Sequence, residues 1–198
     1  MKKIIAGITA IAAIAAFTIA GCKNSTAKVT DIKVDTSQAT LIKRGEYLVT
    51  TMVCEDCHSP KRMGPNGPEI IPELRFSGHP AEAPLPAFDS NEVKNGWVLF
   101  SPDLTAAIGP WGASYAGNLT SDGSGIGNWT FQQFKTALTK GKLKGLETNR
   151  NILPPMPWQN FAKLPEEDMK AIFTFLKSTR PVSNIVPAPK TFAELANK

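Results

Sequence analysis

The clearest hydrophobic pattern in the chain lies in residues 164–181, LPEEDMKAIFTFLKSTRP. Apolar side chains recur there at spacings of three and four, which is typical of a helix with one buried face. They are Met169, Ile172, Phe173 and Leu176. Pro165 suits the first turn, the acidic residues after it favour the positive end of the helix dipole, and Arg180-Pro181 ends the pattern. The sequence predicts a helix here whose apolar face belongs to the core.

Two further helices are predicted from the same spacing. In residues 128–141, Thr130 and Gln133 form a capping-box pair, and Gly141 marks the end. The apolar positions of this helix are Phe131, Phe134 and Leu138. The other helix is expected from about Gln38 to Cys54, with apolar positions at Leu41, Ile42, Tyr47, Leu48 and Met52. Gly45 inside it costs about 1 kcal/mol relative to alanine, so either another helix approaches closely or the glycine is merely tolerated.

Residues 59–118 lack this periodicity and are rich in proline and glycine. The segments GWVLFSPD and IGPWGASYAG could pair as a small hairpin. Loops this long are uncommon in compact domains unless they are functional. We therefore predict an all-α domain over residues 38–187 with a long Pro/Gly-rich insertion, followed by a C-terminal tail at residues 188–198.

The N-terminus has a different pattern. Lys2 and Lys3 precede an uncharged apolar run over residues 4–20, and IAGC closes it, which is the layout of a secretory signal. IAGC resembles the bacterial lipobox, so residues 1–21 are expected to be a cleaved lipoprotein signal and Cys22 the lipid-bearing first residue. A simple cleaved signal and a retained membrane helix are the alternatives. Residues 22–37 are polar and predict a flexible tether with a reach of roughly 20 Å.

Charge and composition add little to this picture. The formal net charge of +5 falls to +3 without Lys2 and Lys3. A nucleic-acid-binding protein would carry a basic stripe, so this mild charge argues against that class. No acid–base pair, nucleophile or phosphate-binding loop stands out in the sequence. We therefore expect neither a small-molecule substrate nor catalysis on this chain.

The candidate chemistry is concentrated in CEDCH, residues 54–58. If Cys22 carries lipid, Cys54 and Cys57 are the two remaining cysteines and must be explained together. Zinc would need four ligands, and His58 is too close in sequence to Cys57 to share one tetrahedron. A redox dithiol would be expected in a βαβ context, which the pattern lacks. C-x-x-C-H is the attachment signal of c-type haem, because thiols one helical turn apart reach two vinyl groups of one porphyrin and the imidazole then lies beneath the iron.

A haem at this position needs a sixth iron ligand or an open site. Met156 stands in NILPPMPWQNF, where flanking prolines stiffen the loop and hold a thioether at a set distance. His79 is the second candidate. Three other methionines lie too near the motif in sequence or within a core stripe; they are Met52, Met63 and Met169. Ligation by histidine and methionine raises the reduction potential relative to two histidines and leaves no open position, which favours one-electron transfer.

These residues give the chain its resemblance to a known family. GEYL in the first helix and AIFTFLKS in the last look like the paired terminal helices of class I cytochromes c. GNLTSDGSGIGNWTFQQFKTALTKG followed by LPPMPWQNFAKLPEEDMKAIFTFLKS is similar to the haem domains of cytochrome c subunits of bacterial membrane-bound alcohol and aldehyde dehydrogenases. The resemblance covers roughly residues 40–187. Such subunits usually carry three haem motifs, whereas this chain carries one.

The resemblance implies a site and a cofactor. Cys54 and Cys57 would form the thioether bonds of one covalent haem c, and His58 and Met156 would be the axial ligands of its iron. The resemblance also implies positions in the haem pocket: Asn118, Ile126 and Trp129 on the propionate side, and Pro68 or Pro65 as the carbonyl that orients His58.

Electron transfer is the function that these inferences predict. The partners would be redox proteins, a periplasmic dehydrogenase and a terminal acceptor such as an oxidase, and lipid on Cys22 would attach the chain to a membrane of the bacterial cell envelope. The alternatives are a haem-based sensor or peroxidase with an open sixth site, and the electron-transfer subunit of a dehydrogenase complex. A basic strip could dock an acidic partner or could be a solvated face. It consists of Lys135, Lys140, Lys142, Lys144 and Arg150.

Overall fold

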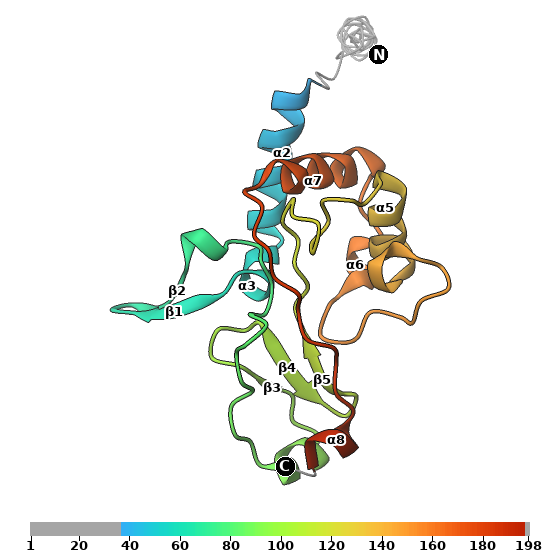
Figure 1. Cartoon of the computed structure of the whole chain (residues 1–198). Coiled ribbons are helices and arrows are strands. Elements are labelled where there is room, and N and C mark those ends of the chain that lie inside the picture. Colours follow the sequence, from blue (N-terminus) through green and yellow to red (C-terminus); the bar gives the residue numbers. More distant parts are fainter. Residues whose placement is uncertain (1–36, 197–198) are drawn as a thin grey trace, which may run out of the picture. The chain divides into compact units, whose positions relative to one another are not determined.

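The computed structural model of the chain describes residues 37–196 (Figure 1). The predicted signal at residues 1–21, Cys22 and the predicted tether up to residue 36 lie outside the described residues. Within residues 37–196, no helix is both long enough and apolar enough to cross a membrane.

Two long helices form the centre of the larger hydrophobic core. α2 (Gln38–Thr51) packs against α7 (Glu166–Ser178), although the two lie far apart in the sequence (Figure 1). Gly45 lies where the helices meet, and a Cβ built on it would stand 2.1 Å from the carbonyl oxygen of Ala171. The glycine is therefore required for the close approach of α7 and is more than tolerated.

The structure confirms the predicted start and end of the middle helix. α5 (Phe131–Lys140) begins with the capping box of Thr130 and Gln133 and ends at a left-handed Gly141. The first helix ends sooner than predicted, because Val53 adopts a left-handed conformation with a φ of 54°. The remaining helical segments are α3 (Cys54–His58), α4 (Ser90–Lys94), α6 (Trp158–Phe161) and α8 (Phe192–Ala196), with 3-10 turns η1 (Pro72–Leu74) and η2 (Leu143–Gly145).

The prediction of an all-α fold is wrong, because the segment expected to be irregular contains two small antiparallel sheets. Of the two segments suggested as a hairpin, only Leu99 and Ile108 lie opposite each other; most of the second segment instead pairs within itself, as the β4–β5 hairpin. The strands are only two to four residues long and show no clear alternation of apolar and polar positions, which is why the pattern did not reveal them. One sheet pairs β1 (Lys61–Gly64) with β2 (Gly67–Ile70), and the other orders β3 (Leu99–Phe100), β4 (Ala106–Gly109) and β5 (Gly112–Tyr115).

The buried apolar side chains form two clusters. The larger one lies among α2, α5 and α7, and it includes Val49, Phe76, Ile126, Phe134 and Phe175. The smaller one lies against the three-stranded sheet, and it consists of Val93, Ile108, Ala113 and Leu195. The insertion therefore contributes to a small hydrophobic core that it shares with the C-terminal segment, despite its proline and glycine content.

The C-terminal segment completes the smaller cluster. The backbone of Lys190 exchanges two hydrogen bonds with Ala113 of β5, at 2.7 and 3.1 Å. Leu195 of α8 is buried, and α8 contacts β5 (Figure 1). The part of residues 188–198 that the structure describes, expected as a tail, is thus packed against the outer edge of β5.

Candidate haem site

The predicted attachment residues lie on α3, the short helix between α2 and β1. Cys54 and Cys57 are both half-buried, carry free thiols and lie one helical turn apart. Burial raises the pKa of Cys54 to about 11, and it also raises the pKa of Cys57. The pair therefore differs from redox C-x-x-C dithiols, in which the thiol pKa is lowered.

His58 ends α3 and is oriented by a distant stretch of backbone. Its Nδ1 lies 2.7 Å from the carbonyl oxygen of Gly117, and because a carbonyl only accepts, Nδ1 carries the donated proton. The carbonyl oxygen of His58 accepts from the amide of Gly78 at 2.8 Å. Burial lowers the pKa of the imidazole, and the bond to Gly117 partly opposes this. A neutral ring that donates from Nδ1 leaves the lone pair of Nε2 for a metal ion.

The carbonyl that orients His58 was expected from Pro68 or Pro65, and this expectation is wrong. Pro68 is exposed on β2, opposite Met63. Gly117 stands 59 positions from His58, and a backbone carbonyl has no signature in the sequence. No pattern in the chain could have identified it before the insertion was placed.

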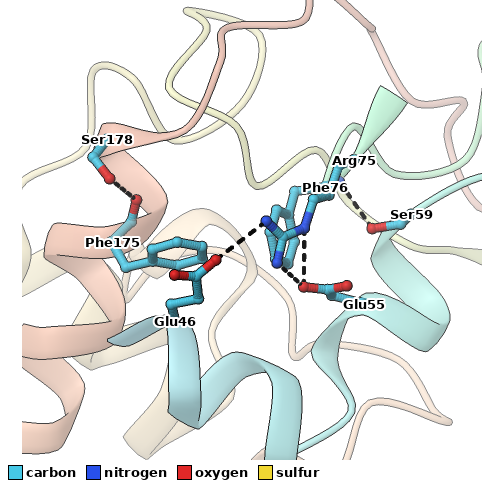
Figure 2. A network of polar contacts seen from close by, with 7 residues as sticks. All are labelled: Glu46, Glu55, Ser59, Arg75, Phe76, Phe175 and Ser178. Atoms are coloured by element: carbon cyan, nitrogen blue, oxygen red, sulfur yellow. Dashed lines mark hydrogen bonds and ion pairs between the residues drawn. The ribbon is translucent and has the colours of Figure 1, made fainter. Parts of the chain in front are cut away.

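Arg75 and Ser59 fasten α3 to the larger core. Figure 2 shows the guanidinium of Arg75 between Glu55 on α3 and Glu46 on α2, with Nε 3.0 Å from a Glu55 oxygen and Nη1 3.6 Å from a Glu46 oxygen. The Ser59 hydroxyl accepts the buried backbone N–H of Phe76 at 2.9 Å (Figure 2). The helix that carries both thiols and the imidazole is therefore held by its side and by its end.

Met156, the predicted distal ligand, is half-buried in the loop that precedes α6. The amide of Ile152 donates to the carbonyl oxygen of Gly141 at 2.6 Å, so the beginning of the loop is tied to the end of α5. The indole of Trp158 lies against Gly141, where a Cβ would stand 2.3 Å from the ring. The amide of Trp158 also donates to the carbonyl oxygen of Met156 at 3.0 Å. Both ends of the loop are thus fixed on α5.

His79, the second candidate for the sixth ligand, is buried and has both ring nitrogens engaged. Its Nδ1 lies 2.8 Å from Thr105 Oγ1, and its Nε2 lies 3.3 Å from the carbonyl oxygen of Ala83. Its ring packs on that of Tyr115, with the centroids 4.7 Å apart. In this arrangement His79 supports the packing of the insertion and offers no free nitrogen to an iron.

The residues implied for the haem pocket occupy different environments. Ile126 is fully buried in the larger cluster, and Trp129 packs against that cluster. Asn118 is buried, and its amide donates to the carbonyl oxygen of Val182 at 2.8 Å while its Oδ1 accepts from the amide of Thr120 at 2.9 Å. The side chain of Asn118 therefore connects the turn at residues 118–120 with the C-terminal segment by hydrogen bonds.

The donor set fits a covalently attached haem. Within residues 37–196, no three His, Cys, Asp or Glu side chains gather into a group that could hold a metal ion by themselves. Two neutral thiols on one helical turn, followed by a neutral imidazole with Nε2 free of the Gly117 bond, match the needs of two thioether bonds and one axial ligand.

The predicted basic strip is partly neutralised by acidic neighbours. Lys135 forms an ion pair with Glu166, and Lys140 pairs with Glu147 at 2.5 Å. Exposed pairs of this kind contribute little to stability, but they reduce the positive field that an acidic partner would meet.

Several known proteins with similar sequences are cytochrome subunits of dehydrogenases. The chain is 30% identical over 75% of its length to the cytochrome c subunit of a quinone-dependent alcohol dehydrogenase from Gluconobacter oxydans, covering 24% of that protein. It is 28% identical over 75% of its length to the gluconate 2-dehydrogenase cytochrome c subunit of Pantoea cypripedii, covering 26% of it, and 28% identical over 76% to the fructose dehydrogenase cytochrome subunit of Gluconobacter japonicus, covering 23%.

The chain thus spans about a quarter of the length of these relatives. No protein-family model matches it. The relatives confirm the resemblance drawn from the sequence: the chain is similar to the c-type cytochrome subunits of dehydrogenases.

Proposed function

We propose that this chain is a mono-haem c-type cytochrome that transfers electrons for a dehydrogenase. Cys54 and Cys57 would hold the haem by thioether bonds, and His58 and Met156 would ligate its iron. The observation that carries the proposal is the imidazole of His58, which directly follows two free thiols and whose Nδ1 lies 2.7 Å from the carbonyl oxygen of Gly117, leaving Nε2 available. When bound, the haem supplies a one-electron iron couple.

The chain's own residues would tune that couple. Gly117 fixes the His58 ring and its tautomer, and a hydrogen bond on the far nitrogen increases the basicity of the ligating one. The thioether of Met156 favours reduced iron and so raises the potential. If His58 and Met156 both ligated the iron, no position would remain for oxygen, peroxide or a substrate. We therefore propose a carrier that performs no catalysis of its own.

Intact mass and spectra of the full chain test this proposal. In a host that installs c-type haem, the purified protein should carry one haem that survives denaturation, and Cys54→Ala with Cys57→Ala should abolish the covalent attachment. The ferric protein should show the far-red charge-transfer band of thioether ligation, and Met156→Ala should remove it. A colourless product would refute haem binding, whereas carbon monoxide binding to the ferrous wild type would indicate an open sixth site and a sensor or peroxidase.

A dehydrogenase as partner is supported by the names of the relatives, all of which are subunits of dehydrogenases. We propose that this chain serves such an enzyme either as its electron-transfer subunit or as a carrier between it and a terminal acceptor such as an oxidase. Affinity purification of the tagged chain from membranes, followed by mass spectrometry, separates the two roles. A stoichiometric dehydrogenase chain indicates a subunit, and its absence with retained redox activity indicates a carrier.

Membrane attachment through a lipid on Cys22, on the periplasmic side of the cell envelope, is proposed from the sequence motif IAGC. Mass spectrometry of the mature N-terminus should find a diacylglyceryl modification on that cysteine. Cys22→Ser should move the chain from the membrane fraction to the soluble fraction, and an unmodified, soluble wild type would refute the anchor.

A further inference from the structure

The insertion touches the loop of Met156 through a buried serine. The hydroxyl of Ser114 on β5 donates to the carbonyl oxygen of Pro154 at 2.6 Å, although the two residues are 40 positions apart. The same hydroxyl oxygen accepts from the indole N–H of Trp111 at 3.2 Å. The Ser114 hydroxyl has one proton. Because its oxygen accepts the bond from Trp111, that proton is available to be donated to Pro154, and hydrogen bonds aligned in this way strengthen each other.

The support under this contact is rigid. Gly109 and Gly112 pair at the end of the β4–β5 hairpin, so Pro110 and Trp111 form a two-residue turn. The Trp111 ring folds back over Gly109, where a Cβ would stand 2.4 Å from it. On its other edge, β5 is paired with the C-terminal segment through two backbone hydrogen bonds. Ser114 therefore projects from a strand that is held on both sides.

The position of the contact within the loop gives it a specific role. The two ends of the loop are fixed on α5, by the amide of Ile152 and by the ring of Trp158. The Ser114 bond holds the middle of the loop, two residues before Met156, and it comes from a different part of the fold. A thioether exchanges with water or with another ligand when its loop can swing outward, so the middle of the loop is where restraint matters most.

We propose that Ser114, aligned by Trp111, is a positioning residue that presents Met156 to the haem iron. The inference rests on the proposed function, because it concerns the same axial ligand. It also assigns a role to the three-stranded sheet of the insertion, which acts as a brace for the loop that carries the distal ligand.

Ser114→Ala and Trp111→Phe test the brace in the full haem-loaded chain. Losing one neutral hydrogen bond should raise the population of the Met156-dissociated state about fivefold. The pH at which the ferric far-red band disappears should then fall by about 0.7 units in Ser114→Ala. It should fall by less in Trp111→Phe, which removes the indole N–H but keeps an aromatic ring and the Ser114 hydroxyl. Ser114→Thr, which restores the hydroxyl, should recover most of the difference. Amide hydrogen exchange at Trp158, which needs no haem signal, should quicken by a similar factor.

Ser121→Ala is the matched control, because its hydroxyl also donates to a backbone carbonyl at 2.6 Å, that of Thr179, away from the loop. If Ser114→Ala and Trp111→Phe titrate like this control, the brace is refuted and the haem assignment stands. If Met156→Ala leaves the wild-type spectrum unchanged, the ligand assignment itself fails and the brace fails with it. Trp111→Phe keeps the test decisive should Ser114→Ala fold poorly.

Discussion

Replacing Gly45 by alanine is expected to destabilise the protein, against the usual effect of this substitution in a helix. In a helix interior, alanine is favoured over glycine by about 1 kcal/mol. At Gly45, however, the added Cβ would stand 2.1 Å from the carbonyl oxygen of Ala171 and 2.6 Å from Cβ of Phe175. Ordinary contacts of a Cβ begin near 3.4 Å, so α7 would have to move away by about 1 Å.

The cost of that movement can be bounded. Adding a methyl group to a well-packed core costs about 1–3 kcal/mol when neighbours can adjust. The obstructing atoms here are a backbone carbonyl and a Cβ, which no side-chain rotation can move, so the upper end of this range applies. After subtracting the gain in helix propensity, Gly45→Ala should lower the free energy of unfolding by about 2 kcal/mol.

Urea denaturation of the full chain as purified measures this difference. Gly123→Ala is the matched control, because Gly123 is exposed and its Cβ would meet nothing closer than 3.4 Å. The control should stay within about 0.5 kcal/mol of the wild type. A Gly45→Ala variant as stable as the wild type, or more stable, would refute the close approach of α2 and α7.

Three further outcomes follow from contacts at the site. Ser59→Ala should cost about 1–3 kcal/mol in urea denaturation, because it leaves the buried N–H of Phe76 without its acceptor; an unchanged midpoint would contradict this. Before haem is attached, iodoacetamide should alkylate Cys54 slowly at pH 7 and faster towards pH 11, because burial raises the pKa of this thiol to about 11. Rapid labelling at pH 7 would contradict the buried position of the thiol. The pKa of His79 is lowered by burial, so the unfolded chain binds more protons and stability should fall as the pH drops below about 6.5; His79→Gln should flatten that slope in a pH series of urea titrations.

The three helices were predictable because their signals are local. The box of Thr130 and Gln133 caps α5 from within four residues, and the apolar stripe of α7 needs only its own spacing. Gly45 was ambiguous in the sequence, since a tolerated glycine and a contact glycine look the same until α7 is placed beside α2. The early end of α2 depends on a left-handed Val53, and a β-branched residue is among the last to be expected there.

The residues of the candidate site also differ in whether a local pattern in the sequence reveals them. C-x-x-C-H is contiguous, so its thiols and imidazole could be named from the sequence. The partner of His58 could not, because Gly117 reaches it only after the insertion has folded into sheets. Those sheets depend on pairings such as Lys190 with Ala113, which join segments 77 positions apart and leave no local periodicity.

Both predicted axial ligands depend on the same few residues of that insertion. Ser114 of β5 bonds to the loop of Met156, and Gly117, two positions beyond the end of the strand, accepts the bond from His58. A shift of β5 would therefore alter the contacts of both predicted ligands together. Because β4 holds one edge of β5 and Lys190 the other, such a shift is opposed from both directions. The segment with the weakest pattern in the sequence is thus the one that contacts both His58 and the loop of Met156.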